Sequence, residues 1–187
     1  MKLNLTLPLP VSINKLYINQ GRFNPALKRM VPTGKRILSP EGAELKERIQ
    51  IDAWNQMKDQ DWDYDFTKDH YIYMDTRIYF NRKGRDDNNI YKLNNDALEK
   101  IVYDNDSRVL TRTQRILYSP HNPRIELLFT PVPFVGIFDD VESFKDFESR
   151  CNSCKKYLKG RCSILKKAIE GFEQEEINQS NCLKYKK

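Results

Sequence analysis

The sequence predicts an α+β fold, in which two main helices pack on a mixed β-sheet in the order β-α-β-α-β-β, followed by a small cysteine-rich module. Apolar residues alternate in some segments, as in half-buried strands, and recur every three or four residues in two others, as in amphipathic helices. All four cysteines fall in the last 37 of the 187 residues. A chain of this length can bury one core and carry a small appendage.

The first forty residues predict one strand and one basic loop. Leu3, Leu5 and Leu7 alternate with polar residues, and the prolines that follow end a strand over residues 2–8. In residues 14–35, glycines and prolines are scattered among basic side chains. This mixture is typical of a long surface loop.

A helix is predicted over residues 40–58. Ser39 supplies an N-cap, Pro40 a first-turn proline and Glu41 an early acidic residue. Apolar residues then recur at helical spacing, at Leu45, Ile49, Ala53 and Met57.

The middle of the chain predicts a strand that runs through a polar corner into a second helix. Alternating apolar residues indicate a strand over 71–80, and residues 81–89 are polar. The next apolar residues follow helical spacing: Ile90, Leu93, Ala97, Leu98 and Ile101. We therefore expect a helix over 90–101.

Two further strands, 109–118 and 124–130, are predicted around a proline-containing turn at 119–123. Together these elements predict one domain over residues 1–131. Residues 132–150 are read as an acidic linker that can form a short helix, and a module with a different composition occupies 151–187.

The positive charge is unevenly placed. The formal net charge is +6, and the first forty residues hold seven Lys or Arg and no acidic residue. Such a stretch favours a phosphate-bearing partner, because each neutralised phosphate releases counterions; a solvated basic face is the alternative. Basic residues interleaved with aromatic rings are suited to phosphates and unpaired bases. The expected DNA-binding residues are Lys15, Tyr17, Arg22, Lys28, Arg29, Lys35, Arg36, Arg82, Lys83 and Arg85.

The polar corner carries the chemistry that points to a metal site. In an extended backbone, residues i and i+2 point the same way, so Asp86 and the side-chain oxygen of Asn88 can face one cation. Lys92 lies one helical turn further on, and a helix N-terminus attracts phosphate. Asp104 and Asp106 follow the helix, and the chain can bring one of their carboxylates back to the same cation. The pattern suits Mg²⁺ and phosphodiester chemistry, although Asp and Asn before a helix also serve as caps.

These residues resemble the signature of the RusA family of Holliday-junction resolvases. That signature reads Asp-x-Asp-Asn-hydrophobic-x-Lys, then Asp-Ala-Leu on the same helix, then an acidic pair before a strand. The matching residues here are Asp86, Asn88, Asn89, Ile90, Lys92, Asp96-Ala97-Leu98 and Asn105-Asp106. The N-terminal Leu-Pro-x-Pro, Asn14-Lys15-x-Tyr17 and Ser39-Pro40-Glu41-Gly42 are also similar. The resemblance covers about residues 1 to 130.

The resemblance implies a homodimeric endonuclease that binds four-way DNA junctions and cuts symmetrically related strands with Mg²⁺ or Mn²⁺. It gives catalytic positions to Asp86, Asn88, Lys92 and Asp106, with Asp86, Asn88 and Asp106 as metal ligands and Asp87 and Asp104 as further candidates. Asp96 is read as structural, an i+4 partner of Lys92 or a dimer contact. The resemblance also implies the cytoplasm of a bacterial host and a phage or prophage setting.

Asn88 departs from the family pattern, which has an aspartate there. An amide oxygen can bind a hard cation, but the site loses one negative charge. Three explanations stay open: Asp87 or Asp104 compensates, the protein binds junctions without cleaving them, or an Asp-to-Asn substitution has inactivated it.

The cysteine module predicts a second metal site. Its four cysteines, Cys151, Cys154, Cys162 and Cys182, follow the spacing C-x2-C-x7-C-x19-C. In the cytoplasm four thiols are better used as ligands than as disulfides, and they suit Zn²⁺ or a [4Fe–4S] cluster, with unligated thiols as the remaining alternative. The module lies outside the RusA resemblance.

Three functional hypotheses follow from the sequence. The first is a structure-selective endonuclease, the second is a junction-binding or regulatory protein that does not cleave, and the third is an interaction module whose tail recruits a partner. No segment approaches the roughly 20 apolar residues of a membrane span, so we expect no membrane contact.

Overall fold

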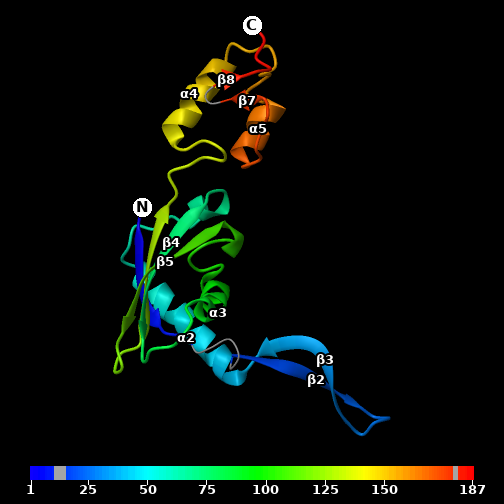
Figure 1. Ribbon diagram of the computed structural model, residues 1–187, viewed down its shortest axis with the longest axis vertical. Helices are drawn as coiled ribbons and strands as arrows, with labels where there is room; N and C mark the ends of the chain where they lie inside the picture. The colour runs from blue at the N-terminus through cyan, green and yellow to red at the C-terminus, as the bar shows by residue number, and fades with distance from the viewer. Residues whose placement is uncertain (11–15, 179–180) are drawn as a thin grey trace. The chain divides into compact units, whose positions relative to one another are not determined.

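The computed structural model describes residues 1–10, 16–178 and 181–187. The chain divides into two compact units, Met1–Val132 and Pro133–Lys187. Figure 1 follows the chain through both units. None of the helices in the described part of the chain has the length and apolar character that crossing a bilayer demands.

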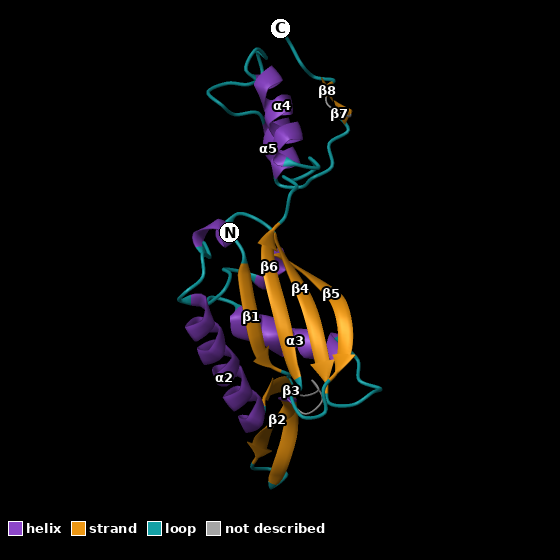
Figure 2. Ribbon diagram, turned by 90° about the vertical axis from the view of Figure 1, so that its left-hand side faces the viewer, coloured by secondary structure: helices purple, strands orange, loops and turns teal. Residues whose placement is uncertain are grey.

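The first unit is built on a four-stranded sheet, so the expected α+β class is confirmed. The strands are β1 (Leu3–Pro8), β4 (Ile72–Phe80), β5 (Val109–Tyr118) and β6 (Arg124–Pro131), in the spatial order β1-β6-β4-β5. β6 pairs antiparallel with β1 and with β4, whereas β4 and β5 are parallel. A parallel pair needs a crossover, and α3 (Asn88–Leu98) lies within it. Figure 2 shows this sheet and the helices beside it.

The core lies between one face of the sheet and the helices α2 (Pro40–Met57) and α3. The inward positions of β1, β4 and β6 follow strict alternation, as the sequence predicted for β1 and β4, whereas β5 has no buried residue. The buried apolar side chains on these strands are Leu3, Leu5, Leu7, Ile72, Met74, Ile78, Phe80, Ile125, Leu127 and Phe129. Their opposite neighbours stay at least partly exposed, so the other face of the sheet is open.

The start of α2 confirms the predicted cap. Ser39 Oγ accepts a hydrogen bond from the backbone N–H of Gly42 at 3.1 Å, and the Ser39 N–H donates to the carbonyl of Leu16 at 2.7 Å. A Cβ at Gly42 would lie 2.9 Å from the same Leu16 oxygen. Absence of a side chain at Gly42 therefore lets the first turn of α2 approach the chain that enters the hairpin.

The expected basic loop is instead a β-hairpin, so that part of the prediction is wrong. β2 (Tyr17–Asn24) pairs antiparallel with β3 (Arg29–Leu38), with an irregularity between Asn19 and Gly21. Asn24 Oδ1 accepts from the backbone N–H groups of Ala26 and Leu27, which closes the turn. The hairpin extends away from the sheet (Figure 1), and only its base, at Tyr17 and Leu38, packs against the core, so most of its length has no apolar alternation. Residues 14 and 15 of the predicted loop lie outside the described residues.

The second helix is shorter than expected and ends at Leu98 rather than at residue 101. Lys100 has a positive φ of 66°, and its N–H donates to the carbonyl of Tyr103 at 2.7 Å. This tight turn reverses the chain before Asp104. Short 3₁₀ segments lie at Asp65–Lys68 and Asp106–Arg108, the second directly before β5.

The second unit contains α4 (Val141–Cys151), α5 (Ser163–Ile169) and the short strands β7 (Ile177–Asn178) and β8 (Asn181–Cys182). Its buried core is small: Phe138, Phe147, Cys151, Leu165 and Ala168. Residues expected to be a linker thus contribute to this unit, because α4 packs Phe147 inward. A capping box between Asp140 and Ser143 begins the helix.

Candidate nucleic-acid interface and metal sites

The predicted polar corner lies between the end of β4 and the first turn of α3. Its residues 86–92, which carry the expected metal and phosphate chemistry, are called the acidic corner below. Asp86 Oδ1 accepts from the backbone N–H of Asn88 at 3.0 Å, so its carboxylate turns back on the first residue of α3. Both Asp86 and Asn88 are exposed. The structure therefore places the Asp86 carboxylate at the helix N-terminus, where free amides favour negative charge, and its contact is with the Asn88 backbone rather than with the Asn88 side chain.

Asp87 has a different environment from Asp86. It is half-buried, and its Oδ2 accepts from Thr113 Oγ1 of β5 at 2.7 Å. The Tyr91 hydroxyl contacts the same Thr113 oxygen, and burial raises the pKa of Tyr91. This contact fixes the start of α3 against β5. Sequence reasoning missed Thr113 and Tyr91, because a strand threonine and a helix tyrosine carry no local signal of contact.

Lys92 lies one turn after Asn88 and reaches toward Asp96. The Lys92 Nζ is 3.7 Å from Asp96 Oδ2 and 5.8 Å from the centre of the Tyr17 ring. The side chain of Lys92 is 57% exposed. The i+4 pairing that the sequence suggested for Asp96 is confirmed, and more than half of the Lys92 side chain remains exposed to solvent.

Tyr17 joins the hairpin to this helix face. Its hydroxyl donates to Asp96 Oδ2 at 3.0 Å, and the Arg36 guanidinium donates to the Tyr17 carbonyl at 3.2 Å. Burial, followed by the hydrogen bond and charge of Asp96, raises the pKa of Tyr17 to about 12. The ring is consequently a neutral contact at ordinary pH.

The two carboxylates after α3 differ in availability. Asp104 Oδ1 lies 2.8 Å from Lys100 Nζ and accepts from the Tyr64 hydroxyl at 3.4 Å, and the Lys100 contact lowers the pKa of Asp104. Asp106 is exposed at the start of its 3₁₀ segment. Burial, followed by the charges of Asp106, Glu99 and Asp96, raises the pKa of Tyr103, which precedes Asp106 by three residues.

The expected ligands are only partly assembled. The Asp86 carboxylate contacts the backbone of Asn88 and Asp104 is engaged with Lys100, whereas the Asp106 carboxylate makes no hydrogen bond or ion pair with another described residue. Among the described residues, no group of three or more His, Cys, Asp or Glu side chains is arranged to hold a metal ion.

The two faces of the hairpin differ in character: one carries the apolar pair Phe23 and Met30, and the other carries Arg22. Phe23 pairs with Met30 across the strands, and Arg22 pairs with Val31 on the opposite face because successive residues alternate. Phe23 and Met30 are 56% and 61% exposed. The charged members of the hairpin are exposed: Arg22, Lys28, Arg29, Lys35 and Arg36. Lys15, which was expected to join them, lies outside the described residues.

Three more basic residues precede the corner. Arg82 and Lys83 are exposed in the turn after β4. Arg85 is half-buried, stacks over Phe80 at 5.1 Å and donates to the carbonyl of Pro10 at 3.3 Å, and burial lowers its pKa. Arg85 therefore holds the turn against the segment that follows β1, whereas Arg82 and Lys83 are exposed and can meet a phosphate.

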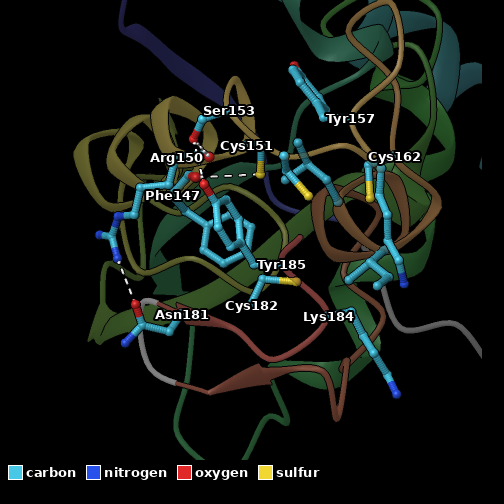
Figure 3. Close-up of a pocket in the computed structure, with 14 residues that line it drawn as sticks. Phe147, Arg150, Cys151, Ser153, Tyr157, Cys162, Asn181, Cys182, Lys184 and Tyr185 are labelled. Carbon is cyan, nitrogen blue, oxygen red and sulfur yellow. Dashed lines mark hydrogen bonds between the residues drawn. The ribbon is translucent and has the colours of Figure 1, made fainter. Parts of the chain in front are cut away.

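The four cysteines of the second unit converge on one pocket of about 390 Å³. Cys151 ends α4, Cys154 follows one turn later, Cys162 is the N-cap residue of α5 and Cys182 lies in β8. Figure 3 shows the side chains of Cys151, Cys162 and Cys182 around this space, with Tyr157 and Tyr185 nearby. All four are free thiols.

Two comparisons with known proteins bear on this site. No protein-family model matches the chain, and no curated protein matches it. The resemblance to RusA resolvases therefore depends on the motif residues themselves.

Proposed function

We propose that this protein binds branched DNA, in particular four-way junctions, and hydrolyses its phosphodiester bonds with a divalent cation. The observation that supports this function best is the grouping at the start of α3: the exposed Asp86 carboxylate accepts the backbone N–H of Asn88, and the exposed Lys92 follows one turn later. A hard-ligand pair, a helix N-terminus and a cation beside one another suit a phosphodiester substrate.

The proposed metal ligands are Asp86, Asn88 and Asp106. Their donor atoms are carboxylate and amide oxygens, which Mg²⁺ and Mn²⁺ prefer, so the donor set fits the group. When bound, the cation polarises the phosphodiester and lowers the pKa of a coordinated water. The Asp106 segment must move for this site to form, because the Asp106 carboxylate does not contact Asp86 or Asn88. We expect DNA binding to bring the Asp106 carboxylate to these two residues.

Lys92 acts on the phosphate in this proposal. Asp96 holds its ammonium on the same side of α3 as Tyr17, which limits the conformations that the long side chain samples. A positive charge so held can stabilise negative charge that develops on the phosphate oxygens in the transition state. Asp96 is then a positioning residue.

The hairpin is proposed to hold the branched substrate. Its charges Arg22, Lys28, Arg29, Lys35 and Arg36 neutralise phosphates, while Phe23 and Met30 offer an apolar face to unstacked bases. A four-way junction exposes such bases at its centre and carries two symmetry-related strands. A homodimer would supply one acidic corner to each of these strands.

A second candidate function is junction binding without cleavage, and Asn88 is the observation that favours it. The amide keeps the shape of an aspartate but removes one negative charge from the cation site. Asp87 is held by Thr113 and Asp104 by Lys100, so neither is free to replace the missing charge without a rearrangement.

The test is cleavage of a labelled four-way junction with Mg²⁺ or Mn²⁺, with a linear duplex as the substrate control. The original protein is compared with Asn88→Asp, with Asp86→Ala and with Asp59→Asn, an exposed carboxylate at the end of α2. We expect paired cuts that require Asp86, are faster in Asn88→Asp and are unchanged in Asp59→Asn. Tight junction binding with no cleavage by either the original protein or Asn88→Asp would establish the second candidate instead.

A further inference from the structure

The open face of the four-stranded sheet carries two internal ion pairs. Figure 2 looks onto this face, with α3 behind the sheet. Arg112 of β5 donates two hydrogen bonds of 2.7 Å, one to each carboxylate oxygen of Asp75 in β4. Within β6, Arg124 donates two hydrogen bonds to Glu126 Oε1 at 3.0 and 2.8 Å, and the Tyr79 hydroxyl donates to Oε2 at 3.1 Å. Both carboxylates are therefore already held by an arginine of the same face.

Two further arginines share this face without such a partner. Arg77 of β4 and Arg115 of β5 stand opposite each other in the parallel pairing of the two strands. Both are exposed, and neither forms a hydrogen bond, ion pair or ring contact with any residue that the structure describes. Glu126 stands opposite Arg77 across the β4–β6 ladder, but its oxygens are engaged as described above. Neighbouring strands are only about 4.8 Å apart, so like charges at facing positions repel.

An irregularity in β5 places Arg115 on this face. The register of β4 with β5 shifts between Thr76 and Arg77, where Gln114 is an extra residue on β5. In an uninterrupted ladder Gln114 would stand opposite Arg77, and the Arg115 side chain would turn to the core side, because side chains alternate along a strand. An extra residue of this kind re-aims the side chains that follow it, and such bulges are frequent next to functional sites. The two arginines thus face each other because of a specific feature of the strand.

We propose that Arg77 and Arg115 form a contact site for the backbone phosphates of a duplex arm of DNA. The inference rests on the proposed function and extends it to a further part of the substrate, the duplex that leads away from the junction. After Arg112 and Arg124 have neutralised the two carboxylates, this face keeps two positive charges that nothing in the described chain compensates. A phosphate between two guanidinium groups removes their repulsion, and the planar donors of arginine match its oxygens.

The lining of the site favours duplex backbone over single-stranded DNA. Both arginines line one pocket, together with the engaged Asp75 and Glu126, and none of the described residues that line it is aromatic. Unpaired bases are held by stacking on aromatic rings, whereas phosphate contacts need only positive charge and hydrogen-bond donors. The net charge of the chain, +6, also favours a nucleic acid over a basic partner.

The test compares binding of a labelled linear duplex and a labelled four-way junction by fluorescence anisotropy at several salt concentrations. The double variant Arg77→Gln/Arg115→Gln should lose about 10- to 100-fold in affinity for both DNAs at low salt, because a duplex arm is common to them. Its slope of log affinity against log salt should become shallower by roughly 2. The matched control is Arg48→Gln/Lys58→Gln, which removes the same charge from exposed positions at α2 and its end and should lose much less.

Two further measurements separate phosphate binding from a structural role. Since the two arginines contact no described residue and repel each other, the glutamine double variant should unfold in urea at the same or a higher midpoint at low salt. The variant Arg77→Lys/Arg115→Lys keeps both charges but loses the planar donors, so it should keep the salt slope and lose less affinity than the glutamine variant. A lower unfolding midpoint of the glutamine variant with unchanged duplex binding would assign the arginines a structural role and overturn the inference.

Cleavage of the junction by the original protein is scored separately, so the inference and the proposed function can fail independently. Duplex affinity and salt slope that stay unchanged in the glutamine variant of a protein that cuts junctions would overturn the inference alone. Weaker duplex binding by this variant, in a protein that binds junctions but never cuts them, would support the inference and remove the nuclease activity. A chain that binds no DNA would overturn both. An effect of the two arginines on binding of polyglutamate but not of duplex would assign them to an acidic protein segment instead and overturn the inference as well.

Discussion

Asp96 Oδ2 accepts the hydroxyl of Tyr17 at 3.0 Å and lies 3.7 Å from the ammonium of Lys92. One carboxylate oxygen therefore joins the first strand of the hairpin to the helix that carries the acidic corner. The hairpin and the corner are parts of one assembly for this reason, although 79 residues separate Tyr17 from Asp96 in the chain.

The first prediction concerns the titration of Tyr17. Its pKa of about 12 is raised by burial and then by Asp96, so Asp96→Asn should lower this pKa toward the ordinary value of 10 without reaching it. Because the folded-state pKa is the higher one, the contact stabilises the protein fully below pH 10 and loses its effect as the pH rises toward 12. Carbon-detected NMR of labelled tyrosine measures the titration.

Tyr17→Phe identifies the resonance and serves as the control for that experiment. The same variant should remove only the contribution of Tyr17 to the pH dependence of the unfolding free energy between pH 10 and 12, because the pKa values of Tyr91 and Tyr103 are also raised by burial. A Tyr17 pKa that is identical in the original protein and in Asp96→Asn would contradict the assignment of this hydrogen bond.

The second prediction tests the hairpin as a DNA contact. Reversal of Lys28 and Arg29 to Glu should weaken junction binding by roughly 10- to 100-fold at low salt, irrespective of sequence, because two phosphate contacts are lost. The slope of log affinity against log salt should become shallower by roughly 2. Fluorescence anisotropy with labelled junctions at several salt concentrations measures both quantities.

A matched charge change controls for net charge. Arg48 and Lys58 lie at exposed positions of α2 and at its end, so their reversal to Glu alters the charge by the same amount away from the hairpin. We expect a much smaller loss of affinity in this variant. An equal loss in both variants would mean that the overall charge, and not the hairpin, determines binding.

Local signals account for what the sequence predicts well. Ser39 begins α2 and the alternation of Ile72, Met74 and Ile78 marks β4, because each depends on neighbours within a few residues. The hairpin is not predicted because its two strands bury little apolar surface. The pairing of Gly21 with Pro32 also leaves no local pattern in the sequence. For the site, the pairing of Lys92 with Asp96 follows from helical spacing. The contact of Asp87 with Thr113 does not, because it joins two elements across a loop.

The third prediction concerns Asp75 on the open face of the sheet, whose contribution to the free energy of unfolding should be lost in acid. Asp75 of β4 accepts two hydrogen bonds from Arg112 at 2.7 Å each and one from Gln114 at 2.6 Å. The Arg112 guanidinium lowers the pKa of Asp75, aided by Gln114 and opposed by burial. The folded-state pKa is the lower one, so this stabilisation is present above about pH 4 and is lost as the pH falls through the folded value.

Asp75→Asn should therefore reduce the free energy of unfolding by about 1–2 kcal/mol at neutral pH and by little at pH 2 to 3, as measured by urea unfolding. Asp52→Asn is the control, because Asp52 forms only a longer contact of 3.8 Å with the exposed Arg48. That control should change stability by at most about 0.5 kcal/mol. A loss for Asp75→Asn that is as large in acid as at neutral pH would exclude an effect of its charge.

The last prediction concerns a polar side chain in the core under the sheet. Asn94 of α3 is 0% exposed, and its Oδ1 has no hydrogen-bond partner among the described residues, while its Nδ2 contacts only the sulfur of Met74 at 3.9 Å. Burial of an amide without partners is costly, whereas leucine has a similar shape and nothing to desolvate. Asn94→Leu should raise the free energy of unfolding by about 1–2 kcal/mol. Asn94→Ala removes the same polar atoms but leaves a cavity, so its gain should be smaller or absent. Calorimetry of both variants distinguishes the two contributions, and a lower stability of Asn94→Leu would show that the amide has a partner that stabilises the folded state.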